Sequence, residues 1–181
     1  MKSLVLALVL LFTVSAAACD KGDKTTEAEV HYQAADGLAG EGKSREAIAE
    51  YDLAISLNPK HVDAYVNRGG EYGILEEYDK AIADFTKALE FEPADELILG
   101  NRGLAYAFTG DYEKALADYA EAIRLAPVKS TAYENRAMVY TMQGQDTAAE
   151  ADVEKAVELG ASLDALNKRI EIFKLRREKA E

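Results

Sequence analysis

The chain has 181 residues, of which 49% are hydrophobic and 30% are charged, a composition typical of a globular domain with a sizeable core. Its formal net charge at pH 7 is -12, so nucleic acid and anionic lipid surfaces would repel it. The charge argues against nucleic-acid-binding proteins as a class, and we expect no nucleic-acid partner.

Residues 1–18 are predicted to be a secretory signal peptide rather than part of the fold. Lys2 precedes an apolar run over residues 4–14, which leads into the small residues SAAA and then to Cys19, the only cysteine. This order of charged, apolar and small residues is that of a secretory leader. The apolar stretch is also shorter than the roughly 20 residues that a membrane-spanning helix needs.

The stretch AAAC at residues 16–19 resembles the lipobox of bacterial lipoproteins, although Ala16 stands where that family most often has leucine. The resemblance implies that Cys19 is lipidated and that the chain is anchored to a membrane of the bacterial cell envelope, facing the periplasm or the cell exterior. Residues 19–27 are then the lipidated cysteine and a polar tether. The alternative is a plain signal cleavage site beside a free thiol.

From residue 28 onward, features return every 34 residues, which is the signature of a repeat architecture. Prolines recur at Pro59, Pro93 and Pro127, where each would stop a helix. Small and large apolar residues recur in phase, as in Ala47, Ala81, Ala115 and Ala149, and in Tyr51, Phe85, Tyr119 and Val153. We predict helices at 28–41, 45–57, 62–75, 79–91, 96–109, 113–125, 130–143, 147–159 and 163–179, with Ser44 and Asp146 as N-caps.

This pattern resembles the tetratricopeptide repeat, most clearly in GLAYAFTGDYEKALADYAEAIRLAP at residues 103–127. The resemblance implies an all-α fold, an α-solenoid of four helix-turn-helix repeats at 28–61, 62–95, 96–129 and 130–161. A capping helix at 162–181 would cover the apolar end of the stack. The alternative for this last helix is that it binds a partner.

The same resemblance implies that a protein or peptide partner binds on the concave face, which the first helix of each repeat lines. The candidate partner-binding residues at the family's inner-face positions are Tyr32, Gln33, Asp36, Asn67, Gly70, Ile74, Asn101, Leu104, Phe108, Asn135, Met138 and Met142. Leu104, Phe108, Met138 and Met142 would form an apolar pocket, unless the final helix covers some of them.

Two details of this face leave alternatives open. One amide per repeat, at Gln33, Asn67, Asn101 and Asn135, would either bind a peptide backbone or hydrogen-bond to the neighbouring repeat. Gly70 and Gly73 each cost a helix about 1 kcal/mol relative to alanine, so they either make room for a ligand or loosen the helix locally.

Chaperone-clamp tetratricopeptide domains hold a C-terminal carboxylate with an asparagine, lysine and arginine. The matching asparagine here is Asn67, but Tyr32, Leu97 and Asn101 stand at the cationic places. We therefore predict no carboxylate clamp.

Arginines and aspartates also recur at the period of 34, at Arg68, Arg102 and Arg136 and at Asp84, Asp118 and Asp152. The family often has leucine where the arginines stand. We predict that each arginine pairs with an aspartate and braces the two helices of one repeat. The alternative is that the arginines bind the ligand.

No catalytic constellation is recognisable, and only His31 and His61, with acidic residues in register, indicate a conceivable weak metal site. We expect no catalytic residue, metal, cofactor or small-molecule substrate. The predicted function is a non-catalytic adaptor that binds a protein partner and assists assembly of an envelope complex such as pilus, secretion or cell-wall machinery, by similarity to lipoproteins of that kind. The alternative is a self-associating structural subunit.

Overall fold

The computed structural model describes residues 16–178. Within this range the helices are α2 (Ala16–Gly40), α3 (Ser44–Leu57), α4 (Val62–Ile74), α5 (Tyr78–Phe91), α6 (Glu96–Thr109), α7 (Tyr112–Leu125), α8 (Ser130–Met142), α9 (Asp146–Glu158) and α10 (Leu163–Glu178). Most of the predicted signal peptide and the side chain of Cys19 lie outside the described residues.

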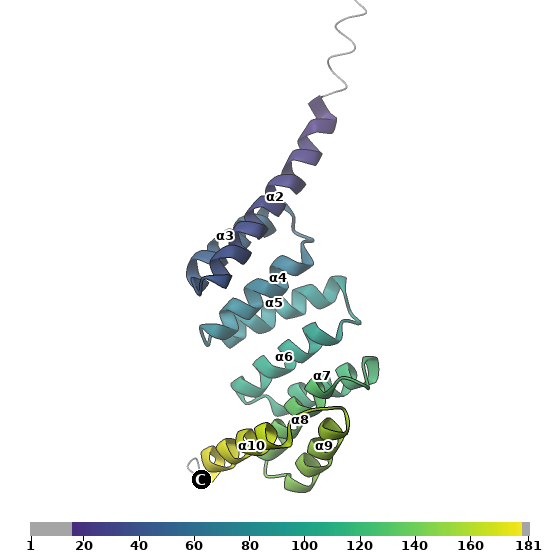
Figure 1. The fold of residues 1–181 in the computed structure, drawn as a ribbon. Coiled ribbons are helices and arrows are strands. Elements are labelled where there is room, and N and C mark those ends of the chain that lie inside the picture. The colour runs from purple at the N-terminus through teal and green to yellow at the C-terminus, as the bar shows by residue number, and fades with distance from the viewer. Residues whose placement is uncertain (1–15, 179–181) are drawn as a thin grey trace, which may run out of the picture.

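The helices form antiparallel pairs that stack in the order of the sequence (Figure 1). The pairs are α2 with α3, α4 with α5, α6 with α7 and α8 with α9, and α10 packs mainly against α8 at the end of the stack. Each described element is a helix, and the second helices of the pairs, α3, α5, α7 and α9, begin 34 residues apart. The prediction of an all-α solenoid of four hairpins and a final capping helix is therefore confirmed.

Close contact between the two helices of a hairpin depends on a small residue opposite an aromatic ring. A Cβ atom at Gly69 would lie 2.9 Å from Cε1 of Phe85, and one at Gly103 would lie 3.1 Å from Cε1 of Tyr119. Both rings are buried. These two glycines therefore let the backbone of the first helix approach the ring of the second.

The turn inside each hairpin uses one residue with positive φ, and these residues are also 34 apart. Three of them are glycines, Gly42 (φ 73°), Gly110 (φ 85°) and Gly144 (φ 72°), for which this conformation has no steric cost. In the second hairpin the residue is Glu76, with φ of 60°. A side chain in this region costs about 1 kcal/mol, so the second hairpin is locally strained.

The ends of the helices follow the prolines as predicted, but the caps differ. Pro59 and Pro93 stand two residues after the ends of α3 and α5. Ser44 and Asp146 are the first helical residues of α3 and α9, one position too late to be N-caps, and the preceding residues make no side-chain cap. Side-chain caps are instead made for α4, α6 and α7 by His61, Asp95 and Asp111.

The first helix begins earlier than expected. We predicted a start at residue 28 after a polar tether, but α2 begins at Ala16 and projects beyond the stack (Figure 1). The described side chains begin at residue 24, and among them residues 24–27 are exposed and Ala28 is the first that is buried. The predicted boundary at residue 28 therefore coincides with this first buried side chain and lies within the helix. No helix within 16–178 combines the length and the apolar character needed to cross a membrane.

Candidate functional site

One face of α4 and α6 carries six of the twelve predicted partner-binding residues at helical spacing. In α6, Asn101, Leu104 and Phe108 follow each other at intervals of three and four residues, which places them on a single stripe. Ile74 and Phe108 are 68% and 43% exposed, although both are large and apolar. An apolar stripe that the chain itself leaves uncovered is a feature of interaction surfaces.

Between α4 and α6 this face is hollowed by a cavity of about 280 Å³, here called the central pocket. Its lining is almost wholly apolar and consists of Gly69, Gly70, Gly73, Ile74, Tyr78, Ala81, Phe85, Asn101, Leu104, Ala105 and Phe108. The rings of Tyr78 and Phe108 stack at its rim, with centroids 4.9 Å apart and planes at 12°.

The central pocket exists because α4 lacks side chains that α6 has. A Cβ atom at Gly70 or Gly73 would meet no other atom within 4 Å, so both glycines border open space. One unit later the same positions are Leu104 and Ala107. Helix α4 runs unbroken to Ile74, which favours the interpretation that these glycines make room over the interpretation that they loosen the helix.

A second hollow of about 430 Å³ continues the groove toward α2, and we call it the acidic pocket. Its lining residues are Asp36, Ala39, Gly40, Tyr51, Val66, Asn67, Gly70, Glu71, Ile74 and Asn101. Gly70, Ile74 and Asn101 border both hollows. The two pockets therefore form one groove across α2, α4 and α6.

The four amides that recur once per repeat, at Gln33, Asn67, Asn101 and Asn135, are here called the ladder amides. Three of them form hydrogen bonds within the chain. Asn67 donates to Tyr32 Oη at 3.2 Å and to Asp36 Oδ1 at 2.8 Å, across the boundary between the first two hairpins. Gln33 donates to Glu29 at 3.0 Å within α2. For these residues the structure favours scaffold hydrogen bonds over ligand contact.

The other two amides differ from each other. Asn135 Oδ1 accepts a hydrogen bond from Arg169 of α10 at 3.4 Å. Asn101 is exposed, and its side chain has no hydrogen-bond partner among the described residues. It borders the central pocket, the acidic pocket and a third hollow beside Leu97. Asn101 is therefore the ladder amide that remains available to a ligand.

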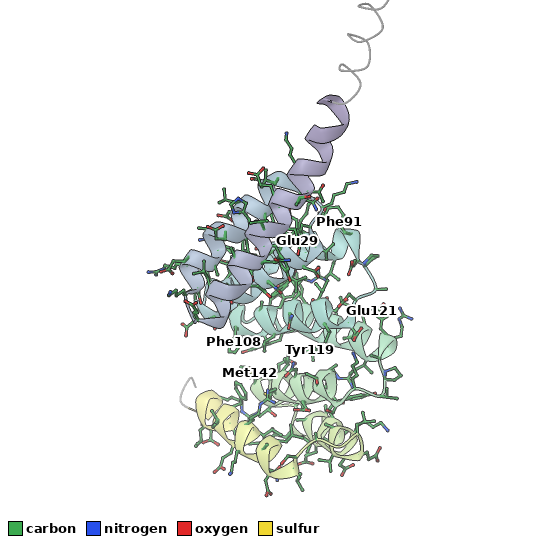
Figure 2. All side chains as sticks on the ribbon, turned by 45° about the horizontal axis from the view of Figure 1, so that its top comes forward. Glu29, Phe91, Phe108, Tyr119, Glu121 and Met142 are labelled. Carbon is green, nitrogen blue, oxygen red and sulfur yellow. The ribbon has the colours of Figure 1, made fainter. Side chains whose placement is uncertain are left out.

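The predicted apolar pocket around the methionines is largely closed by α10. Met138 is only 5% exposed, and the hollow beside it, which Phe173 of α10 also lines, has a volume of about 20 Å³. Met138 is thus a buried residue, which disfavours its predicted role in partner binding. Phe108 and Met142 lie near one edge of the stack, opposite Phe91 (Figure 2).

Models of the tetratricopeptide repeat match residues 28–61, 62–95, 97–127 and 130–163, which together are most of the chain. The chain belongs to the tetratricopeptide repeat family. Solenoids of this kind present extended concave surfaces for binding, so the chain is a protein-interaction scaffold.

Solved structures share the tetratricopeptide fold of this chain. MamA from Desulfovibrio magneticus RS-1 is 23% identical with a TM-score of 0.70, covering 73% of this chain and 75% of that one. The first tetratricopeptide domain of Spaghetti (RPAP3), solved with an HSP90 peptide, is 22% identical with a TM-score of 0.64, covering 66% and 95%. The Arabidopsis OM64 domain is 25% identical with a TM-score of 0.62, covering 64% and 96%. No curated protein sequence matches.

The three arginines brace their tetratricopeptide units, as predicted. The Nε and Nη2 atoms of Arg102 donate to the two carboxylate oxygens of Asp118, both at 2.8 Å. The same two-bond geometry joins Arg68 to Asp84 (2.7 and 2.6 Å) and Arg136 to Asp152 (both 2.7 Å). The arginines are therefore satisfied internally, and the ligand-binding alternative is not supported.

The environment of each brace keeps the arginine charged. The hydrogen bonds that Arg102 donates to Asp118 raise the pKa of Arg102 above its ordinary value, against the opposing effect of burial. For Arg68, burial is the largest single influence and lowers the pKa. The interactions with Asp84 and with Asp52 of the preceding unit together outweigh it, so the pKa of Arg68 is raised. Arg68 thus ties its own unit to the previous one as well.

The two histidines have structural partners rather than a shared site. His31 Nδ1 lies 2.6 Å from Glu50 of α3, and His61 accepts from the backbone nitrogen of Ala64 at 3.4 Å as the N-cap of α4. His61 Nε2 also lies 3.5 Å from Glu29. Among residues 24–178, no cluster of three ligands suits a metal ion.

Two groove residues were not predicted from the sequence. Tyr78 begins α5 and stacks on Phe108, and no periodicity of the first helices indicates it. Glu71 lines the acidic pocket. The sequence could have indicated this residue, because the equivalent residues one and two units later are the apolar Ala105 and Val139. A charged residue at a repeat position that is apolar in the next two units indicates a candidate binding residue.

Proposed function

We propose that this chain is a non-catalytic adaptor that binds a segment of a protein partner in the groove formed by α2, α4 and α6. Asn101 carries the proposal, because its amide has no hydrogen-bond partner within the described part of the chain and lies where three hollows meet. The exposed side chains of Ile74, Leu104 and Phe108 supply apolar area around it. The HSP90 peptide bound to the Spaghetti domain supports peptide recognition by this fold.

The proposal includes no chemistry on a substrate. The ionisable groups closest to a catalytic arrangement, His31 and His61, are engaged with Glu50 and the start of α4. The groove is lined mainly by apolar side chains, with the amides of Asn67 and Asn101 and two carboxylates, which suit recognition of a polypeptide rather than a nucleic acid. We propose that the chain needs no cofactor, metal or small-molecule substrate.

Filling the central pocket is expected to weaken capture of the partner without destabilising the fold. Gly73→Leu adds a side chain where a Cβ atom meets nothing within 4 Å, and leucine is the better helix former, so the melting temperature should not fall. An apolar side chain buried in such a pocket contributes about 1.5–3 kcal/mol, so displacing it should weaken capture about tenfold or more.

The measurement is in-cell photo-crosslinking from a probe at position 108. The matched control for an added apolar side chain is Ala83→Leu, at an exposed position of α5. A probe at Lys87, whose ammonium lies over Phe91 at 5.3 Å, reports on the other helix layer. Equal capture from both probes, or capture that Gly73→Leu leaves unchanged, would contradict the groove proposal.

We also propose that Cys19 is lipidated and anchors the adaptor to a membrane of the bacterial envelope, with its tetratricopeptide domain in the periplasm or outside the cell. The lipobox-like AAAC at residues 16–19 supports this. In this arrangement the exposed residues 24–27 of α2 separate the groove from the membrane surface. Cells grown with radioactive palmitate should label the chain but not Cys19→Ala. Equal labelling of both would rule the anchor out.

The apolar side chains exposed on α10 support a second candidate function. Leu163, Ile172 and Leu175 are each about half exposed. The chain would then be a self-associating subunit of an envelope complex, joined through this end of the solenoid. Self-association requires the molar mass of the full chain to rise with concentration.

A further inference from the structure

Glu71 of α4 is a buried residue whose carboxylate has no partner among the side chains that the structure describes. Its side chain is 8% exposed, and its Oε2 atom is inaccessible and accepts no hydrogen bond among the described residues. In the next two units the same position holds Ala105 and Val139, which are buried apolar residues. Burying an unpaired charge lowers stability, so packing within the hairpin gives no reason for a glutamate here.

The described lining of the pocket that holds Glu71 contains a second carboxylate but no compensating cation. Asp36 of α2 lines the same acidic pocket, and its Oδ1 atom accepts hydrogen bonds from Tyr51 at 3.0 Å and from Asn67 at 2.8 Å. Among the described residues that line the pocket, none is lysine, arginine or histidine. Arg68, nearby in sequence, is held by Asp84 and Asp52. The pocket therefore has unbalanced negative charge.

The shape of the pocket distinguishes between possible cations. Ala39, Val66 and Ile74 supply apolar walls beside the carboxylates. A lysine or arginine side chain matches this combination, because its methylene stem packs on apolar surface while its charged end donates to carboxylates. A calcium ion takes six to eight oxygen ligands, and the pocket provides two carboxylates and few other oxygens.

We infer that the acidic pocket binds a basic side chain of the partner segment, with Glu71 as its ion-pairing carboxylate, while an apolar side chain of the same segment occupies the central pocket. The inference rests on the proposed groove function and adds to it the chemistry of the partner. The shared border at Gly70, Ile74 and Asn101 puts the two side chains within one short segment. The chain's net charge of -12 favours such a partner at long range.

The test is selection of a phage-displayed library of random peptides on the full chain in detergent, followed by the same selection on Glu71→Gln. Peptides selected on the unchanged chain are expected to carry lysine or arginine near an apolar residue. Their affinity for Glu71→Gln should fall about tenfold or more, since charge-assisted hydrogen bonds are the stronger class. Glu113→Gln, the same change at an exposed position of α7, should leave affinity unchanged.

The thermal stability of Glu71→Gln provides an independent readout. Removing an unpaired buried charge should leave the melting temperature unchanged or raise it, whereas a fall would show that Glu71 has a stabilising partner and would overturn the inference. Selection of apolar peptides without basic residues would keep the groove function but overturn the basic-side-chain inference. A failure to select any peptide would count against both. Calcium binding that Glu71→Gln removes would assign the pocket to a metal ion instead.

Discussion

Replacing Arg102 by leucine is expected to lower the free energy of unfolding by about 3 kcal/mol. The substitution leaves the carboxylate of Asp118, whose side chain is 9% exposed, buried without the guanidinium that now donates to both of its oxygens. It also removes the guanidinium from above the ring of Tyr106, 5.8 Å from its centroid. For a chain of this length the melting temperature should fall by roughly 10 °C.

Two further variants make the result specific to the brace. The double variant Arg102→Leu with Asp118→Leu removes both charges, and it should recover much of the loss because neither ion is then buried alone. Arg124→Leu breaks the exposed pair with Glu121 and is expected to have little effect. If Arg102→Leu instead abolished partner capture at an unchanged melting temperature, the arginine would be a ligand-binding residue.

Replacing Leu166 by alanine is expected to release α10 from the end of the solenoid. Leu166 is 2% exposed and shares a core cluster with Ala137, Val153 and Ala156. A buried leucine truncated to alanine costs about 3 kcal/mol, and here the loss falls on a single helix held mainly against α8. Amide hydrogen exchange should therefore increase throughout α10 before it increases in α4 or α6.

The same variant tests what α10 does. Once α10 is released, the buried surface around Met138 becomes exposed, and an uncapped solenoid end tends to associate. Light scattering should show a molar mass that rises with concentration for Leu166→Ala but not for Leu175→Ala, whose side chain is 49% exposed. A rise already present in the unchanged chain and lost in Leu175→Ala would favour the self-association candidate over a simple cap. Unaltered exchange in Leu166→Ala would show that this contact does not hold the helix.

The internal braces were predictable because their partners lie within one repeat. Arg102 and Asp118 are 16 residues apart, and both recur at the period of 34, so a pairing seen once is repeated. The opposition of Gly103 and Tyr119 is local in the same way. The start of α2 was predicted less well, since residues 19–27 carry no apolar periodicity and yet belong to the helix, with residues 24–27 exposed.

The exposed part of the groove was less predictable. Helical periodicity places Asn67, Asn101 and Asn135 on one face alike, yet their surroundings differ. Asn67 meets residues 31 and 35 positions earlier, and Asn135 meets Arg169, 34 positions later. Contacts of this range join different hairpins, and the sequence pattern of one helix does not contain them.

The sequence by itself determined the 34-residue unit, its helix pairs and its Arg–Asp braces, because each depends on spacing within a single hairpin. Only the tertiary structure decided which inner-face residues stay available, because stacking buries a side chain through its neighbours. It placed Met138 beneath α10, left Asn101 without a hydrogen-bond partner among the described residues, and put Glu71 and Asp36 in one pocket whose described lining contains no cation. The availability of a group to a partner is thus a property of the assembled stack.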